Sequence, residues 1–175
     1  MIRRQPEVWM RGALPGYAPL LQPVAHSLMQ SLEEVQSHLP LLTSAELWRR
    51  PNGAAAAGYH VRHAAGSLDR LLTYARGEQL TPAQLAALKA EGEPELDPHA
   101  VTRLADHFAE AVGRALEQIR NTSESSLLEA RGVGRAQLPS TVMGLLFHAA
   151  EHTLRHIGQM ITTIKVVHGP RAEEA

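Results

Sequence analysis

The sequence predicts an all-α protein, a four-helix bundle with a long crossover between its second and third helices. Four long segments repeat their apolar residues at spacings of three and four, which is the period of an amphipathic helix. Proline, glycine or a capping residue bounds each segment, and the alternation typical of β-strands is rare. Four such helices in 175 residues suit a bundle around one core.

The first long helix is expected at 19–39 and the second at 55–76, because apolar residues recur there with the helical period. Between the two helices, Thr43 and Glu46 have the spacing of a capping box, which predicts one short helical turn. Gly77 is expected to end the second helix, since glycine adopts the left-handed conformation that closes many helices.

The crossover contains a further start signal. Thr81 precedes a proline at the first helical position, which predicts a short helix over 82–91. Asp97 stands before another proline in the same way, so the third long helix is expected at 98–121.

The C-terminal part of the chain is expected to hold the longest helix. Residues 121–137 are rich in Ser, Gly and charged side chains and predict a loop with one helical turn. The fourth long helix is expected at 139–168. We expect residues 1–175 to form a single domain, with an irregular arm at 1–17 and a flexible tail at 169–175. Trp9 and Met10 are expected to anchor the arm on the bundle.

Composition excludes several classes of protein. The chain has no Cys, which excludes disulfides, thiolate metal sites and a cysteine nucleophile. Its net charge is -1 with both signs interspersed, so no nucleic-acid partner is expected. No apolar run is long enough for a membrane span or a secretory signal, and we expect a cytoplasmic protein.

Histidines on the fourth helix are the first candidates for a site. His148, His152 and His156 are each four residues apart and share one helix face, where two imidazoles can hold one ion. His156 falls inside the apolar arc and His152 at its border, whereas His148 lies toward Glu151 and Arg155. Ten His make one such pair common by chance, so each imidazole could instead bond a carboxylate or a backbone carbonyl.

Two more helices carry candidates. On the second helix, His60 lies nearer the centre of the apolar arc than His63, and the first helix contributes His26. Tyr59 and Tyr74 flank His63 along the helix and could line a pocket, although aromatics at helical spacing more often pack in a core.

Three segments of the chain resemble the DinB/YfiT-like family of metalloenzymes. They are Leu47-Trp48-Arg49-Arg50-Pro51-Asn52-Gly53, His63-Ala64-Ala65-Gly66-Ser67 and Glu151-His152-Thr153-Leu154-Arg155-His156-Ile157-Gly158-Gln159. The last segment is similar to the family ending EHxxxHxGQ, and the resemblance covers residues 18–168. It implies a DinB-like four-helix bundle. One departure is the run Ala54–Ala57, where the family often has an aromatic residue that Trp48 or Trp9 would have to replace.

The resemblance implies a metal triad of His63, His152 and His156, so at one position it prefers His63 to the more inward His60. Such a site would hold one divalent ion, zinc or nickel first, with iron and cobalt as alternatives. The groups left as an additional ligand, or as hydrogen-bond partners of the ligands, are His26, His60, His148, Glu151, Gln159 and Asp69.

The family resemblance also implies a reaction. Relatives include thiol-dependent enzymes, which favours a transferase that joins a low-molecular-weight thiol to a small-molecule electrophile. The alternatives are a metal-dependent hydrolase and a non-catalytic metal- or ligand-binding module of a stress response. No catalytic residue can be assigned beyond the ligands.

A second apolar strip on the fourth helix predicts self-association. Met143, Phe147, Leu154 and Ile161 lie nearly opposite the candidate ligands, and a helix with two apolar sides needs burial on both. We expect a homodimer through this strip. The alternative is that the N-terminal arm or the loop 121–137 covers it.

Overall fold

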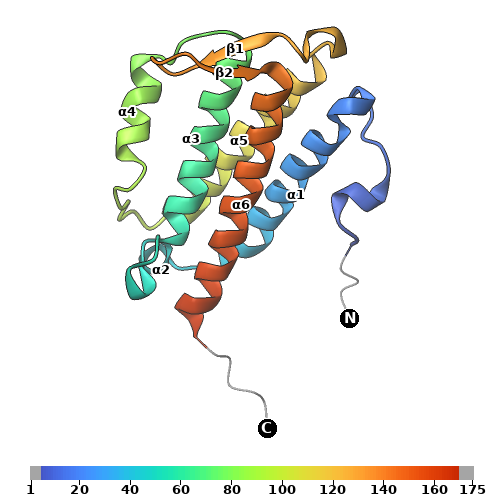
Figure 1. Ribbon diagram of the computed structural model, residues 1–175. Coiled ribbons are helices and arrows are strands. Elements are labelled where there is room, and N and C mark those ends of the chain that lie inside the picture. The colour runs from blue at the N-terminus through green and yellow to red at the C-terminus, as the bar shows by residue number, and fades with distance from the viewer. Residues whose placement is uncertain (1–4, 170–175) are drawn as a thin grey trace.

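The computed structural model describes residues 5–169 and consists of four long helices packed side by side (Figure 1). They are α1 (Gln22–His38), α3 (Ala57–Ala75), α5 (Ala100–Arg120) and α6 (Val142–His168). Both α3 and α1 contact α5 and α6, which closes the bundle around one core. The all-α bundle predicted from the sequence is confirmed.

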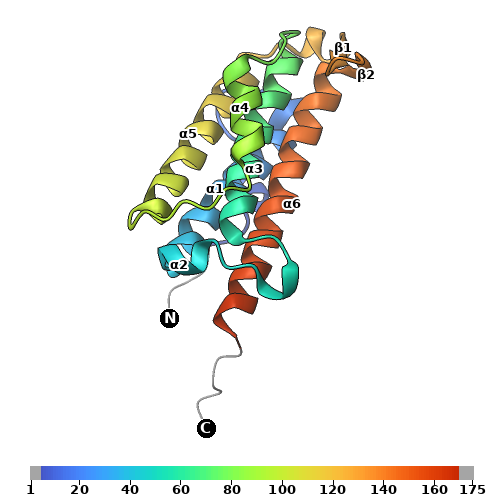
Figure 2. The ribbon, with the colours of Figure 1, turned by 90° about the vertical axis from the view of Figure 1, so that its left-hand side faces the viewer.

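Short elements connect the long helices. They are α2 (Ser44–Leu47), α4 (Pro82–Ala90), the strands β1 (Ala130–Val133) and β2 (Leu138–Thr141), and single 3-10 turns at Val8–Arg11, Pro19–Leu21, Leu39–Leu41, Pro51–Gly53 and Glu124–Ser126. The crossover from α3 to α5 carries α4, which lies along the outside of α3 (Figure 2). The long crossover was predicted from the sequence. Glu91, the residue that follows α4, contacts one of the histidines described below.

Capping residues explain where the helices start. Thr43 forms the predicted capping box at α2, and Thr81 forms one with Gln84 at α4. The third long helix starts two residues later than expected, because Asp97 accepts the backbone N–H of His99 and so holds the chain in a turn.

A β-hairpin replaces part of the expected loop. The sequence predicted a loop over 121–137 and a helix from Pro139, but β1 and β2 pair antiparallel, with Ala130 opposite Thr141. Thr141 then caps α6 by accepting the N–H of Gly144 at 3.0 Å. The helix-start prediction at Pro139 was therefore three residues early, and the one predicted helical turn is Glu124–Ser126.

The core follows the predicted apolar faces. Every residue of the predicted arc on α6 is buried: Val142, Leu145, Ala149, Met160, Ile164 and Val167. The large side chains that are fully buried include Phe108, Leu28, Leu68 and Leu146, one from each long helix. Each such burial contributes about 1.5–3 kcal/mol to folding.

The N-terminal arm packs on α1 through one residue that the sequence did not single out. Val8 is 3% exposed, whereas Trp9, the expected anchor, is 62% exposed. The backbone N–H of Val8 donates to Gln30, and Arg11 forms a two-point ion pair with Glu33. The expectation that Trp9 anchors the arm or fills the bundle was wrong.

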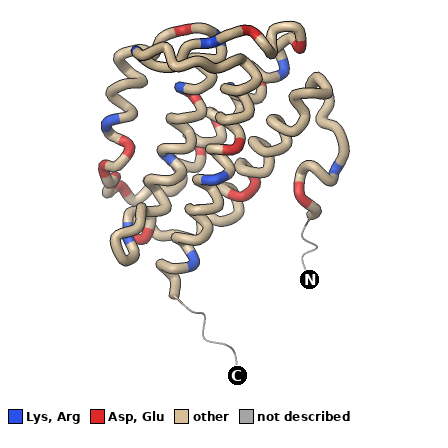
Figure 3. The backbone as a smooth tube through the Cα atoms, viewed as in Figure 1, with Lys and Arg blue, Asp and Glu red and all other residues tan. Residues whose placement is uncertain are grey.

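Charges and termini complete the description. Basic and acidic residues are interspersed along the chain, without a continuous stripe of one sign in this view (Figure 3). Within residues 5–169, no helix is long and apolar enough to cross a membrane. Apart from Gly169, the tail expected at 169–175 lies outside the described residues.

Candidate metal centre

Three histidines from two helices converge where α3 packs on α6. His63 projects from α3, and His152 and His156 project one turn apart from α6. One ring nitrogen of each lies within 4.8 Å of the others, so the three could hold a metal ion. The closest approach joins Nε2 of His63 and Nε2 of His152 at 3.0 Å.

A buried carboxylate orients His63. Nδ1 of His63 lies 2.7 Å from Oε2 of Glu91, the residue that follows α4. Glu91 is 4% exposed, and its other oxygen accepts a hydrogen bond from Arg70 at 2.6 Å. An anionic acceptor at Nδ1 assigns the proton to that nitrogen and leaves the lone pair on Nε2, the atom that faces His152.

A glycine leaves room for this ion pair on α3. A Cβ added at Gly66 would lie 2.5 Å from Oε1 of Glu91 and 2.8 Å from Nη1 of Arg70. Both atoms belong to side chains that are themselves held by the hydrogen bond between them. Gly66 therefore leaves the space that the Glu91–Arg70 pair occupies next to His63.

His60 on α3 contacts His156, the second candidate ligand on α6. Its Nδ1 lies 3.1 Å from Nδ1 of His156, and its side chain is buried at 7% exposure. In a hydrogen bond between them, one Nδ1 donates its proton to the other. If Nδ1 of His156 is the donor, Nε2 of His156 keeps its lone pair and can bind an ion. The structure thus places His60 against His156 and brings His63 together with His152 and His156, the three residues that the family resemblance implies as ligands.

Burial keeps these imidazoles in the neutral form. Burial, and then repulsion from the neighbouring imidazoles, lowers the pKa of His156 to about 4. The pKa values of His152 and His60 are lowered for the same reasons. Neutral imidazole is the form that binds metal ions, so the site is ready for a cation at neutral pH.

The Glu91 carboxyl is ionised in spite of its burial. Burial alone would raise its pKa, but hydrogen bonds from His63 and Arg70 outweigh that effect and hold the pKa below its usual value. The site therefore combines neutral nitrogen donors with one buried anion beside them, which favours a cation.

The three residues fit a divalent ion. Two nitrogens bound to one tetrahedral zinc ion, each at about 2.0–2.1 Å, lie roughly 3.3–3.4 Å apart, a little more than the 3.0 Å between Nε2 of His63 and Nε2 of His152. Nδ1 of His152 is buried and has no hydrogen-bond partner within residues 5–169. The two Nε2 atoms face each other from neighbouring helices, in a position where both imidazoles could share one cation.

The outer histidine of the α6 series does not join the triad. The ring of His148 lies 5.3 Å from that of His152, but its Nδ1 is paired with Glu151 at 2.7 Å on the surface. Glu151 also binds Arg155. Neither His148 nor Glu151 hydrogen-bonds a triad nitrogen, so the structure gives them no direct part in the ligand set among the residues it describes.

The remaining candidates lie in different surroundings. Nε2 of His26 contacts the backbone carbonyl of Gly12 at 3.0 Å, which ties the arm to α1 rather than serving the site. Gln159 is exposed and lines a cleft of about 500 Å³ that also contains His60. Tyr59 stacks on His63 with the ring centroids 5.5 Å apart, whereas Tyr74 packs against the core.

Sequence reasoning missed Glu91 as the partner of His63. Among the groups that the sequence offered for this role, Asp69 instead accepts the side-chain amide of Gln84 and joins α3 to α4. In the sequence, Glu91 stands in a polar stretch with Glu93 and Glu95 and resembles a solvated linker. The end of the predicted helix 82–91 was the one available signal, since it placed this carboxylate where the chain must turn.

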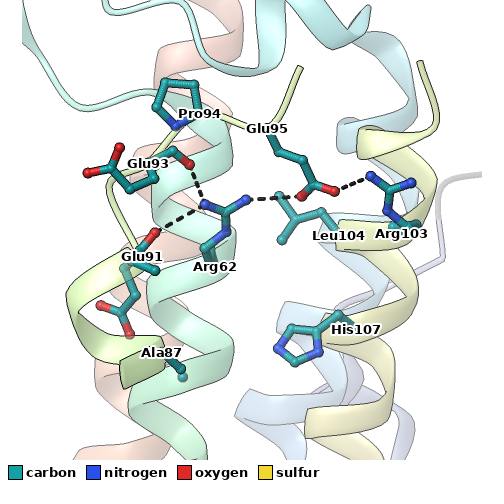
Figure 4. A pocket seen from close by; sticks show the side chains of 11 residues that line it. Arg62, Ala87, Glu91, Glu93, Pro94, Glu95, Arg103, Leu104 and His107 are labelled. Atoms are coloured by element: carbon teal, nitrogen blue, oxygen red, sulfur yellow. Dashed lines mark hydrogen bonds and ion pairs between the residues drawn. The ribbon is translucent and has the colours of Figure 1, made fainter. Parts of the chain in front are cut away.

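A separate cavity of about 630 Å³ lies beside α3, between α4 and α5 (Figure 4). Arg62 donates there to the carbonyls of Ala90 and Glu93 and to the side chain of Glu95, which also binds Arg103. These contacts hold the linker after α4 and so fix Glu91, which borders the cavity. None of the triad histidines lines it.

Known proteins place the chain in a family. The model of the DinB superfamily matches residues 27–160, more than half of the chain, and the protein therefore belongs to this superfamily. No curated protein matches the sequence at a significant level. Two solved structures share the fold at low sequence identity.

The first is a conserved protein from Enterococcus faecalis, with a TM-score of 0.65 and 19% identity over 86% of this chain and 98% of that one. The second is a DinB-like protein from Bacillus cereus ATCC 10987, with a TM-score of 0.59 and 17% identity over 80% of this chain and 87% of that one. Both are similar to this chain in fold, which confirms the DinB-like bundle. The reaction has to be argued from the residues of the site.

Proposed function

We propose that this protein is a divalent-metal-dependent enzyme that transfers a low-molecular-weight thiol to an electrophile. The observation that carries the proposal is the convergence of His63, His152 and His156, three nitrogen donors within 4.8 Å of one another. Three histidine ligands, with the fourth position left to water or substrate, are the ligand set of catalytic rather than structural zinc sites.

His63, His152 and His156 would hold the ion, with zinc or nickel proposed first and iron or cobalt as alternatives. When bound, such an ion lowers the pKa of a thiol or a water that binds beside it. Glu91 would keep His63 in the required tautomer, and His60 would do so for His156. The ring of Tyr59 covers one face of His63 and limits water there.

In the transfer, the thiol gives its proton to solvent and its sulfur forms a new bond to the electrophilic carbon. With 1-chloro-2,4-dinitrobenzene as a probe, chloride leaves with the bonding electron pair and a thioether is the product. Hydrolysis would replace the thiol by water in the same place. Thiol transfer is preferred because the family resemblance favours it, and the test below separates the two.

The test compares wild-type protein without a histidine tag, His156→Ala and the control His107→Ala, which removes an exposed imidazole on α5. We expect one equivalent of metal and thiol-dependent turnover of the probe in wild type and control, and loss of both in His156→Ala. Metal without turnover for any cellular thiol would favour the non-catalytic module. Turnover of ester probes without thiol would favour the hydrolase.

We also propose that the protein is a cytoplasmic homodimer. Low-molecular-weight thiols are kept reduced in the cytoplasm, where a thiol transferase would need them. On α6, Phe147 is 61% exposed, whereas Met143 and Ile161 pack partly against the core. Light scattering at micromolar concentration tests the dimer, and Phe147→Glu should shift a dimer toward the monomer mass.

A further inference from the structure

A second candidate binding site lies near the triad. A cleft of about 330 Å³ lies before the start of α3 and is lined by Trp48, Arg50, Ala55, Ala56, Tyr59 and Pro94. Its size falls at the lower end of the range for small-molecule sites. The methyl side chains of Ala55 and Ala56 leave this space open.

The cleft reaches the candidate metal centre through one ring. Tyr59 forms part of the cleft wall, stacks on His63 with 15° between the ring planes, and meets His156 edge-on at 6.5 Å. A molecule in the cleft would therefore lie one aromatic ring away from two of the three triad imidazoles. For transfer, the electrophilic carbon of such a molecule must extend past the Tyr59 ring toward the triad.

Aromatic and cyclic side chains make up much of the wall. The indole of Trp48 is fixed by the guanidinium of Arg62, whose Cζ lies 4.3 Å from the ring centroid. The indole N–H of Trp48 is buried without a hydrogen-bond partner in the described part of the chain. With Tyr59 and Pro94, this wall favours a flat apolar group, for which rings offer stacking and edge contacts.

One cation in the cleft has no carboxylate partner within residues 5–169. Arg50 contacts only the backbone carbonyls of Gly53 and Ala54, at 3.4 and 3.5 Å. By contrast, Arg62 and Arg103 in the larger cavity are both paired with Glu95. A guanidinium of this kind recognises a carboxylate through two parallel hydrogen bonds.

We propose that this cleft binds the electrophilic substrate as an aromatic carboxylate, with its ring against Trp48 and Tyr59 and its carboxylate on Arg50. The inference deepens the proposed function, on which it rests, by naming the substrate class. It makes Arg50 and Ala55, which are not among the candidate metal ligands, specificity-determining residues.

The test uses the fluorescence of Trp48 in the full chain with Trp9→Phe, which leaves a single tryptophan. The probes are 4-nitrobenzoate, whose nitro group quenches indole fluorescence on contact, and the neutral 4-nitrobenzamide. We expect saturable quenching and about tenfold tighter binding of the acid, the effect of one charge-assisted contact. Equal affinity for the acid and the amide would overturn the assignment.

Four variants locate the contacts. Arg50→Gln should remove the preference for the acid, whereas Arg49→Gln, the same change at the exposed neighbour, should keep it. Ala55→Phe should abolish saturable quenching because the ring fills the cleft, and Ala54→Phe, outside this cleft, should not. Unchanged binding in both Arg50→Gln and Ala55→Phe would contradict the proposal.

Metal content and thiol transfer, measured on the same samples, separate the two proposals. Binding of the acid without bound metal and without thiol transfer would contradict the proposed function and still support the cleft as a carboxylate-binding site. Transfer to chlorodinitrobenzene without any selective binding of the acid would sink the cleft assignment alone. If Ala55→Phe fails to fold, Arg50→Gln decides the question, since Arg50 is exposed.

Discussion

Replacing Glu91 by Gln is the sharpest perturbation of the site that leaves all three candidate ligands in place. The carboxylate accepts from His63 at 2.7 Å and from Arg70 at 2.6 Å, with side-chain exposures of 18%, 10% and 6% for His63, Arg70 and Glu91. The amide is nearly the same size and keeps one acceptor oxygen, so one of the two contacts must lose its acceptor. Removing the charge leaves the Arg70 guanidinium buried without an anion.

Two effects of Glu91→Gln can be estimated. Loss of a hydrogen-bond partner behind a metal-binding histidine typically weakens metal affinity by about 10–100-fold. Breaking a buried ion pair on one side costs about 3 kcal/mol or more, which lowers the Tm of a chain of this size by roughly 6–12 °C. Both losses should appear together because His63 and Arg70 both lose the negative charge that faces them, whichever one the amide oxygen still contacts.

The assay is competition of the protein with a chelating dye for zinc, together with thermal unfolding of the metal-free protein. Glu93→Gln is the matched control, since Glu93 stands two residues away and offers Arg62 its backbone carbonyl rather than its side chain. The control should keep both wild-type values. Wild-type zinc affinity in Glu91→Gln would refute the claim that the carboxylate orients His63.

The remaining predictions concern packing, pH, capping and the ion. Gly66→Ala should lower the free energy of unfolding by about 1–3 kcal/mol in a denaturant titration, because its Cβ meets the Glu91–Arg70 pair; an unchanged midpoint would show that the pair can move aside. The folded pKa of His156 is about 4 and its unfolded value is 6.5, so the metal-free protein should lose stability as pH falls from 6.5 toward 4, and His156→Gln should show a shallower loss between these values. Thr141→Ala removes the cap of α6 and should cost about 1 kcal/mol, or roughly 2–4 °C in Tm, and no change would mean that the hairpin alone sets the helix start. Free zinc at 100 times its Kd should add about 2.7 kcal/mol of stability in wild type and none in His152→Ala, whereas equal gains in both would place the ion elsewhere.

The long helices could be predicted because their apolar residues keep the helical period, and tertiary packing uses the faces that the period defines. The hairpin could not. β1 and β2 have four residues each, lie largely at the surface, and carry glycine or proline rather than alternating β-branched residues. Their pairing is set by contacts across the turn, and the sequence window that predicts a helix start at Pro139 contains only one of the two strands.

The site was predictable in part for a related reason. Periodicity gave the inward direction of His60 but not the identity of the third triad member, since residues three apart on α3 both lie near α6. The segment from His63 to Ser67 supplied that choice through its resemblance to the family. Glu91 reaches His63 only through the crossover, over 28 residues, and no local pattern encodes that contact.

The central claim is that His63, His152 and His156 bind one metal ion together. X-ray absorption of the zinc-loaded protein tests it most directly, because imidazole ligands give a distinctive multiple-scattering pattern. We predict three imidazole nitrogens at about 2.0–2.1 Å in wild type and two in His63→Ala. A spectrum without imidazole scattering, or one that stays unchanged in His63→Ala, would contradict the account.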